Sequence, residues 1–284
     1  KVFLNSFFEC KLSIKKFLHL FSYQSNLAKI ISKKINIICD LYEVQNIITP
    51  YESQPFQNKV FKDAKERNIK TTGYTAVSQP FPSHNIYRDG SPDLLLVHSN
   101  QEKKHLVQYL DWPEKKIRLI NSISYKKKPN QILKKKIFIP YSINSENILL
   151  GNFEKLVSKR ENSSICFFKT QNHPYMHDSS QHKIFIEKLE ILKRKYKNFS
   201  KIKNGNTSIF FCESYGILEL LSRGMEVYHI CSNPILETYS KKMWPGIQVT
   251  NLDRHILKYK LKNNLACIKL GNKKNNIIKY LKKS

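Results

Sequence analysis

The stretch from Thr207 to Val227 reads TSIFFCESYGILELLSRGMEV, and it decides the fold class. Its first part, through Phe211, is a short run of apolar and β-branched residues that predicts a buried strand. Ser214 stands where an N-cap begins a short helix, and Gly224 ends that helix before a second strand begins at Glu226. A strand, a helix and a strand in this order predict a βαβ unit with parallel strands.

The same alternation of short apolar runs and helical patterns recurs along the chain. Apolar and β-branched runs predict strands at 35–39, 46–49, 69–74, 93–98, 117–121, 137–141, 164–169, 208–212 and 226–230. The clearest helix is predicted over 181–196, where apolar residues form a stripe at helical spacing: Phe185, Leu189, Leu192 and Tyr196. Strands that alternate with helices predict Rossmann-like α/β domains with parallel sheets.

A charged segment with a proline divides the pattern into two parts. Residues 126–136 read KKKPNQILKKK between two predicted strands. The 284 residues are enough for two domains with separate cores. We therefore expect an N-terminal domain over 1–130 and a C-terminal domain over 131–284. The chain opens on Lys1 rather than Met, which is compatible with a truncated N-terminal domain.

Composition narrows the classes of partner and chemistry. Lys and Arg total 49 against 22 acidic residues, a formal charge of +27, which favours phosphates, anionic lipid or nucleic acid. An A/T-rich coding sequence would produce part of this lysine excess. The six cysteines form no CxxC pair, which fits a reducing cytoplasm. The sequence holds no dinucleotide fingerprint, P-loop, DxD motif or metal-ligand spacing, so we expect no metal or cofactor.

Polar residues follow two predicted strands of the second domain, at the edge where open α/β sheets bind ligands. His173 precedes Pro174, which biases it away from helical geometry, and its imidazole could donate to a phosphate. An ordinary loop histidine is the alternative. The second group consists of Glu213, Ser214, Tyr215 and Gly216. At a helix start this group would present backbone amides to an anion, although many serine caps bind no ligand.

The first domain offers a candidate general base. Glu52 lies in the loop 50–55 between a predicted strand and a helix, where a carboxylate can accept a proton. The alternative is a surface glutamate favoured by the helix dipole. Gln54 shares this loop, and Ser78 and Gln79 lie in a second loop, 75–84, that would line an acceptor pocket.

Residues 45–250 together resemble GT-B glycosyltransferases of bacterial surface-carbohydrate (capsule and lipopolysaccharide) biosynthesis. His173-Pro174 is similar to the His-Pro motif of sialyl-, polysialyl- and Kdo-transferases, and Ser214 to their following serine motif. Glu219 is similar to the glutamate of the GT-B helix that contacts the donor. Two departures stand out: Glu213-Ser214 replaces two adjacent serines, and Phe211 replaces the first glutamate of the EX7E pair.

The resemblance implies two domains facing across a cleft and metal-independent sugar transfer. The donor would be a nucleotide-sugar, with a CMP-sugar favoured and UDP or GDP as alternatives, bound by the second domain. The acceptor would be a saccharide or a lipid-linked sugar at an anionic inner-leaflet surface, which attracts basic proteins. A basic nucleic-acid-binding protein and a GT-B-like epimerase or polyol-phosphate transferase are the alternatives.

Overall fold

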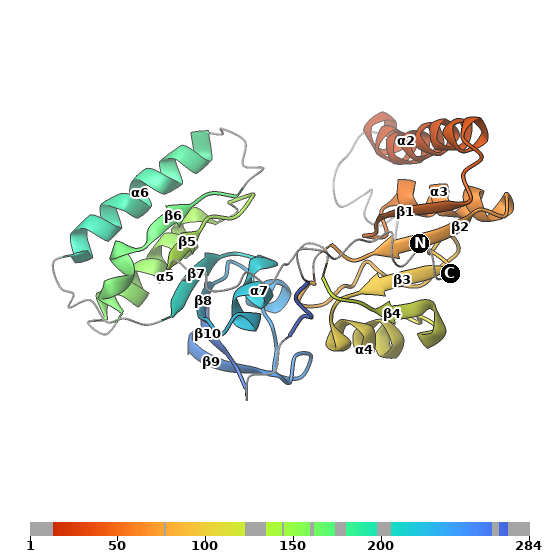
Figure 1. Ribbon diagram of the computed structural model, residues 1–284. Coiled ribbons are helices and arrows are strands. Elements are labelled where there is room, and N and C mark those ends of the chain that lie inside the picture. The colour runs from red at the N-terminus through yellow and green to blue at the C-terminus, as the bar shows by residue number, and fades with distance from the viewer. Residues whose placement is uncertain are drawn as a thin grey trace.

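The computed structural model describes residues 14–76, 78–122, 135–143, 145–159, 162–173, 180–197, 206–262 and 267–271. Two sheets flanked by helices make up the fold (Figure 1). This confirms the prediction of an α/β fold with parallel sheets. We call the described residues between 14 and 122 the first domain and those between 135 and 262 the second domain. The predicted boundary near residue 130 and the linker around it lie outside the described residues.

The first domain is built on four parallel strands in the order β1-β2-β3-β4. The four strands predicted between residues 46 and 121 are confirmed to within one or two residues at their ends. In chain order the elements are α2 (Ile14–Leu41), β1 (Asn46–Pro50), α3 (Pro55–Glu66), β2 (Lys70–Tyr74), β3 (Leu94–Val97), α4 (Asn100–Tyr109), η1 (Glu114–Lys116) and β4 (Ile117–Leu119).

The predicted strand at 35–39 is wrong, because these residues form the end of helix α2. Their apolar side chains belong to a helical repeat rather than to an extended run. Ala28 and Cys39 are buried and Ile35 packs between them, at helical spacing. The buried Ser32 hydroxyl donates to Asp63 on α3 at 2.6 Å, which fixes the same face of α2 against α3.

The second domain is built on a mixed sheet in the order β6-β5-β7-β8-β10-β9. The first four strands are parallel, and β10 pairs antiparallel with both β8 and β9. In chain order the elements are β5 (Lys136–Phe138), α5 (Glu146–Ser158), η2 (Ser163–Phe167), β6 (Lys169–Gln171), α6 (Ser180–Lys197), β7 (Thr207–Phe211), α7 (Gly216–Ser222), β8 (Glu226–Ile230), α8 (Pro234–Glu237), β9 (Ile247–Asp253) and β10 (Ile256–Leu261).

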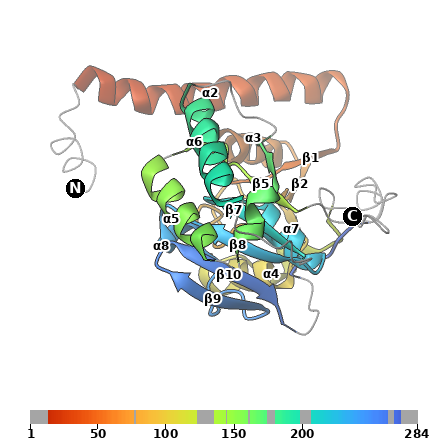
Figure 2. The same cartoon turned by 90° about the vertical axis from the view of Figure 1, so that its left-hand side faces the viewer.

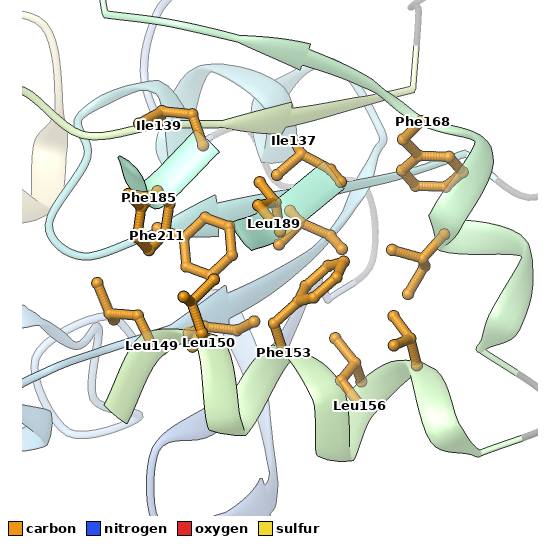
Figure 3. Packing of buried hydrophobic residues seen from close by; sticks show 14 of the residues in the cluster. Ile137, Ile139, Leu149, Leu150, Phe153, Leu156, Phe168, Phe185, Leu189 and Phe211 are labelled. Atoms are coloured by element: carbon orange, nitrogen blue, oxygen red, sulfur yellow. The ribbon is translucent and has the colours of Figure 1, made fainter. Parts of the chain in front are cut away.

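One core of the second domain lies between this sheet and helices α5 and α6 (Figure 3), and a second core packs around α7, β8 and β10. The predicted helix over 181–196 is confirmed as α6, and its Phe185 and Leu189 are fully buried. Phe185 packs edge-on against Phe211 of β7 at 5.3 Å, and Phe153 of α5 approaches the same ring at 5.8 Å. These contacts hold β7, which leads to the candidate site, rigidly in the sheet.

One further prediction needs correction, and one pair of strands was missed. The strand predicted at 164–169 is a 3-10 turn, η2, followed by the short strand β6. Its apolar residues Ile165 and Cys166 are buried under α5 and α6, so their burial does not require an extended chain. The hairpin of β9 and β10 was not predicted. Gly224, by contrast, ends α7 with a φ of +81° as expected of a C-cap glycine.

Candidate functional site

The strand order of the second domain places a topological switch point between β5 and β7. From β5 the chain crosses to β6 on one side, and from β6 it returns past β5 to β7 on the other side. Ligands of open α/β sheets bind outside the carboxyl ends of the strands at such a point. The residues that follow β5, β6 and β7 therefore form the candidate donor side.

His173 lies two residues beyond the end of β6 and is half-buried. Its ring meets the edge of Tyr141, which follows β5, with centroids 5.7 Å apart and planes at 75°. Two of the three strand ends at the switch point thus contribute neighbouring rings. Pro174, the second residue of the predicted motif, lies outside the described residues.

The turn after β7 is held in an unusual backbone conformation. Cys212 has a φ of +55°, a left-handed geometry that non-glycine residues seldom adopt. Its N–H donates to the Ile230 carbonyl at 2.8 Å, and its own carbonyl lies 2.8 Å from Nε2 of His229. Burial lowers the pKa of His229 to about 4, so the ring stays neutral. The buried histidine therefore fixes the direction in which the chain leaves β7.

Ser214 does not cap the helix that follows, so the predicted N-cap is wrong. Helix α7 begins at Gly216, and Tyr215 occupies the N-cap position without any side-chain cap. Ser214 takes part in the turn before the helix through its backbone: its carbonyl accepts from the Ile217 amide at 3.3 Å. Gly216 packs closely against β7, since a Cβ there would stand 3.0 Å from the buried ring of Phe210 and would force that ring to shift.

Glu219 is half-buried in α7 and forms an ion pair with Arg223, one turn further along the helix. Arg223 lines a hollow of about 530 Å³ together with Thr207 and Glu226, the first residues of β7 and β8. This hollow lies at the amino edge of the sheet, opposite the switch point. Glu219 is therefore paired with a residue of its own helix, and this residue, Arg223, lines the hollow at the amino edge and not the candidate donor side.

Glu52 is exposed in the turn between β1 and α3. The buried Gln57 side chain organises this turn, because its Oε1 accepts from the amides of Glu52 and Gln54, each at 3.0 Å. Gln54 itself is exposed at the N-cap of α3. Ser53 has a φ of +56°, so this turn and the one after β7 both contain a left-handed residue.

The structure brings Glu52 and Gln79 of the first domain to Glu213 and Tyr215 of the second. The Gln79 amide donates to the Tyr215 hydroxyl at 3.1 Å. Burial, and after it the nearby carboxylates of Glu213 and Glu52, raise the pKa of Tyr215. Burial also raises the pKa of Glu213. The half-buried Tyr215 hydroxyl therefore contacts the first domain through Gln79 and lies within electrostatic range of a carboxylate from each domain.

Further contacts join the carboxyl edges of the two sheets. Tyr239 donates to the Ser78 carbonyl at 3.3 Å, and Trp244 Nε1 donates to the Pro80 carbonyl at 2.7 Å. His105 Nε2 lies 2.8 Å from the Met243 carbonyl. In these three hydrogen bonds, the first-domain partners lie in helix α4 or in the loop after β2. The loop that the sequence singled out as the acceptor side is therefore the main contact with the second domain.

The side chain of Ser78, predicted to line an acceptor pocket, is buried inside the first domain. Its hydroxyl donates to Glu102 at 2.8 Å and lies 3.0 Å from Nε2 of His98. All three side chains are buried. Burial raises the pKa of Glu102 to about 7 and lowers that of His98 to about 4. Sequence reasoning missed this cluster, since its members are separated by a strand and part of a helix and no local pattern joins them.

A segment near the end of the chain closes the interface from the other side. Lys269 donates its amide to the His98 carbonyl at 2.7 Å and accepts from the Ser122 amide at 2.6 Å. Its neighbour Ile268 donates to the Ser222 hydroxyl at the end of α7 at 3.2 Å. Residues 267–271 thus bind both domains.

No group of three or more His, Cys, Asp or Glu side chains is arranged to hold a metal ion within the described part of the chain. None of the helices described is both long and apolar enough to cross a membrane.

No protein-family model and no curated protein matches the chain. Among solved structures, the chain is similar to a glycosyltransferase from Rickettsia africae ESF-5, with 16% sequence identity and a TM-score of 0.37. The alignment covers 72% of this chain and spans 61% of the length of that protein. A TM-score of 0.37 is too low to transfer a fold, an activity or a ligand from that protein to this chain.

Proposed function

We propose that this protein transfers a sugar from a nucleotide-activated donor to a saccharide or lipid-linked acceptor, at the interface of its two domains. The observation that carries the proposal is the meeting of the two carboxyl sheet edges, where Glu52 and Gln79 approach Glu213 and Tyr215. Ligand sites of α/β domains form at these edges. A reaction between two substrates needs such a place, where each domain can present one of them.

On the donor side, the residues that follow β5, β6 and β7 would bind the nucleotide phosphates. His173 would donate to a phosphate oxygen, and the backbone near Ser214 would contribute amides. The resemblance of His173-Pro174 to the His-Pro motif of sialyl- and Kdo-transferases favours a CMP-sugar. Positive charge and hydrogen bonds aimed at the departing phosphate would supply most of the stabilisation of the transition state.

On the acceptor side, Glu52 would act as the general base. The acceptor hydroxyl would attack the anomeric carbon, the bond from that carbon to the phosphate oxygen would break, and the hydroxyl proton would pass to the Glu52 carboxylate. Glu52 is exposed and lies next to the Gln79–Tyr215 pair, which could position the acceptor. The reaction would need no cofactor beyond the nucleotide-sugar.

Thermal unfolding with CMP, CDP, UDP and GDP tests the donor side. One nucleotide should raise Tm, and His173→Ala should remove that rise. Lys260→Ala is the matched control, because Lys260 lines the hollow at the opposite edge of the same sheet. A Tm rise that survives His173→Ala but disappears in Lys260→Ala would move nucleotide binding to the hollow and refute the proposed site.

The acceptor side is tested by a variant that separates binding from chemistry. Glu52→Gln should keep the Tm rise with nucleotide and lose about 10²- to 10⁴-fold in transfer rate, the usual contribution of a general base. The readout is release of the nucleotide product from the donor in the presence of an acceptor. A variant with the transfer rate of the wild type would exclude Glu52 as the base.

A further inference from the structure

Helix α2 is the outermost element of the first domain in both views (Figures 1 and 2). One face of it packs on α3 through buried Ala28, Ser32 and Cys39. The opposite face carries large apolar side chains that are 40–71% exposed: Leu27, Ile30, Ile37, Ile38 and Leu41. We call these five residues the α2 stripe.

The α2 stripe runs along the helix from Leu27 to Leu41, with Lys34 between its two apolar groups. At 100° per residue its members fall within an arc of about 100°, the width of the apolar face of an amphipathic helix. A helix that packs on one face normally turns polar residues outward, as α3 does with Lys62 and Glu66. Helix α2 therefore has a second apolar face that the described residues leave in contact with water. Such a contiguous patch is typical of an interaction surface.

Lysines determine what this surface can bind. Lys29 and Lys33 lie along one flank of the α2 stripe, Lys34 lies within it, and all three are exposed. The acid on that flank, Asp40, is already paired with Arg67 of the neighbouring helix α3. An apolar face bordered by lysines matches an anionic lipid surface, because the stripe can enter the acyl boundary while the ammonium groups reach the head groups.

We propose that the α2 stripe docks the protein on an anionic bilayer surface, with α2 lying parallel to the membrane plane. A second copy of the chain fits the stripe less well, since two molecules of formal charge +27 would bring their lysine-bordered faces together. The α2 stripe does not contribute to the interface between the domains, so this inference is independent of the proposed sugar transfer.

Vesicle pelleting of the full chain tests the proposal. We expect binding to vesicles of phosphatidylglycerol and phosphatidylcholine, and at least about tenfold weaker binding to phosphatidylcholine alone, since each lysine near an anionic surface contributes about 1 kcal/mol. Ile30→Gln/Ile37→Gln/Leu41→Gln should weaken binding to the anionic vesicles about tenfold or more. The matched control is Ile235→Gln/Leu236→Gln, two apolar residues that are 89% and 71% exposed on the second domain.

A second variant keeps the test valid if the first fails to fold. Lys29→Gln/Lys33→Gln/Lys34→Gln leaves the apolar residues in place and should reduce the preference for anionic vesicles. Equal pelleting of wild type and both α2 variants would overturn the proposal. So would a dimer, seen by sedimentation velocity without vesicles, that the Ile30/Ile37/Leu41 variant dissociates. Because the nucleotide-dependent rise in Tm should persist in both variants, failure here is distinguishable from failure of the proposed function.

Discussion

Glu102→Gln should make the protein progressively more stable than the wild type as the pH rises. Glu102 is buried, and burial raises its pKa from 4.5 to about 7. Between these values the unfolded chain has released the proton while the folded protein keeps it, so the wild type loses stability as the pH increases from 4.5 to 7. At about 1.4 kcal/mol for each tenfold difference in proton affinity, the loss is about 3 kcal/mol.

Glutamine keeps the shape of the side chain and an oxygen that can accept from Ser78, but it has no proton to release. The stability difference between variant and wild type should therefore grow by about 2.5 kcal/mol from pH 5 to pH 8, which corresponds to about 4 °C in Tm for a chain of this length. Thermal unfolding at both pH values measures it. His229 titrates in both proteins, so its contribution cancels in the difference.

The control removes a carboxylate from the surface of the same domain. Glu66→Gln on the exposed side of α3 should show a much smaller pH-dependent difference from the wild type. The reasoning would be refuted if Glu102→Gln differed from the wild type by the same Tm at pH 5 and pH 8. That result would mean that Glu102 is ionised in the folded protein and that a cation balances it.

Three further predictions follow from the packing around the candidate site. Gly216→Ala should destabilise the protein by about 1–3 kcal/mol, because its Cβ would crowd Phe210 at 3.0 Å. Gly151→Ala, on the open side of α5 with no atom within 4 Å, should instead stabilise it by about 0.5–1 kcal/mol, and a thermal unfolding comparison that ranked them in the other order would contradict both. Trp244→Phe should cost about 1–3 kcal/mol by leaving the Pro80 carbonyl without its 2.7 Å donor. The readout is faster hydrogen exchange at the amides of Ser78, Gln79 and Phe81, and unchanged exchange would argue against an anchoring role. His229→Gln should reduce the loss of stability on acidification, since the neutral buried ring, with a pKa of about 4, loses its stabilising effect as the pH falls from 6.5 towards 4.

The parallel strands could be predicted from sequence because burial on both faces leaves a local signal. In β7 the apolar run is Ile209 to Phe211, and in β8 the signal comes from the β-branched and aromatic residues Val227, Tyr228 and Ile230. The predicted bounds of both strands agree with the structure to within one residue. The run 35–39 carried a similar signal but forms a helix. Its repeat is visible only when Ala28 and Ser32 are included, so a five-residue window could not separate the two periods.

The hairpin of β9 and β10 had a signal that a period-2 reading would have found. In β10 the buried Leu257 and Tyr259 alternate with Lys258 and Lys260, and the turn at 254–255 separates it from β9. The wrong N-cap at Ser214 has a different cause. Residue type alone favoured a serine cap, but the buried His229 and the left-handed Cys212 set the path of the turn. Such long-range constraints are absent from the local sequence.

The same limit applies to the candidate site. Sequence position placed Glu52, Gln79, Glu213 and Tyr215 after strands, and parallel topology collects such residues at one edge of each sheet. Which residues meet across the two domains depends on how the domains pack, and that packing uses Trp244, a residue without any recognisable motif. The association of Ser78 with His98 and Glu102 likewise depends on tertiary packing.

The return of residues 267–271 to the first domain bears on how the protein is made. The strands of the first domain leave the ribosome long before Lys269, whose backbone bonds with His98 and Ser122 complete that domain. The nascent first domain therefore forms these two bonds only after the described part of the second domain, which ends at residue 262, has been synthesised. A product that stops before residue 267 would keep both sheets and still lack this closing connection.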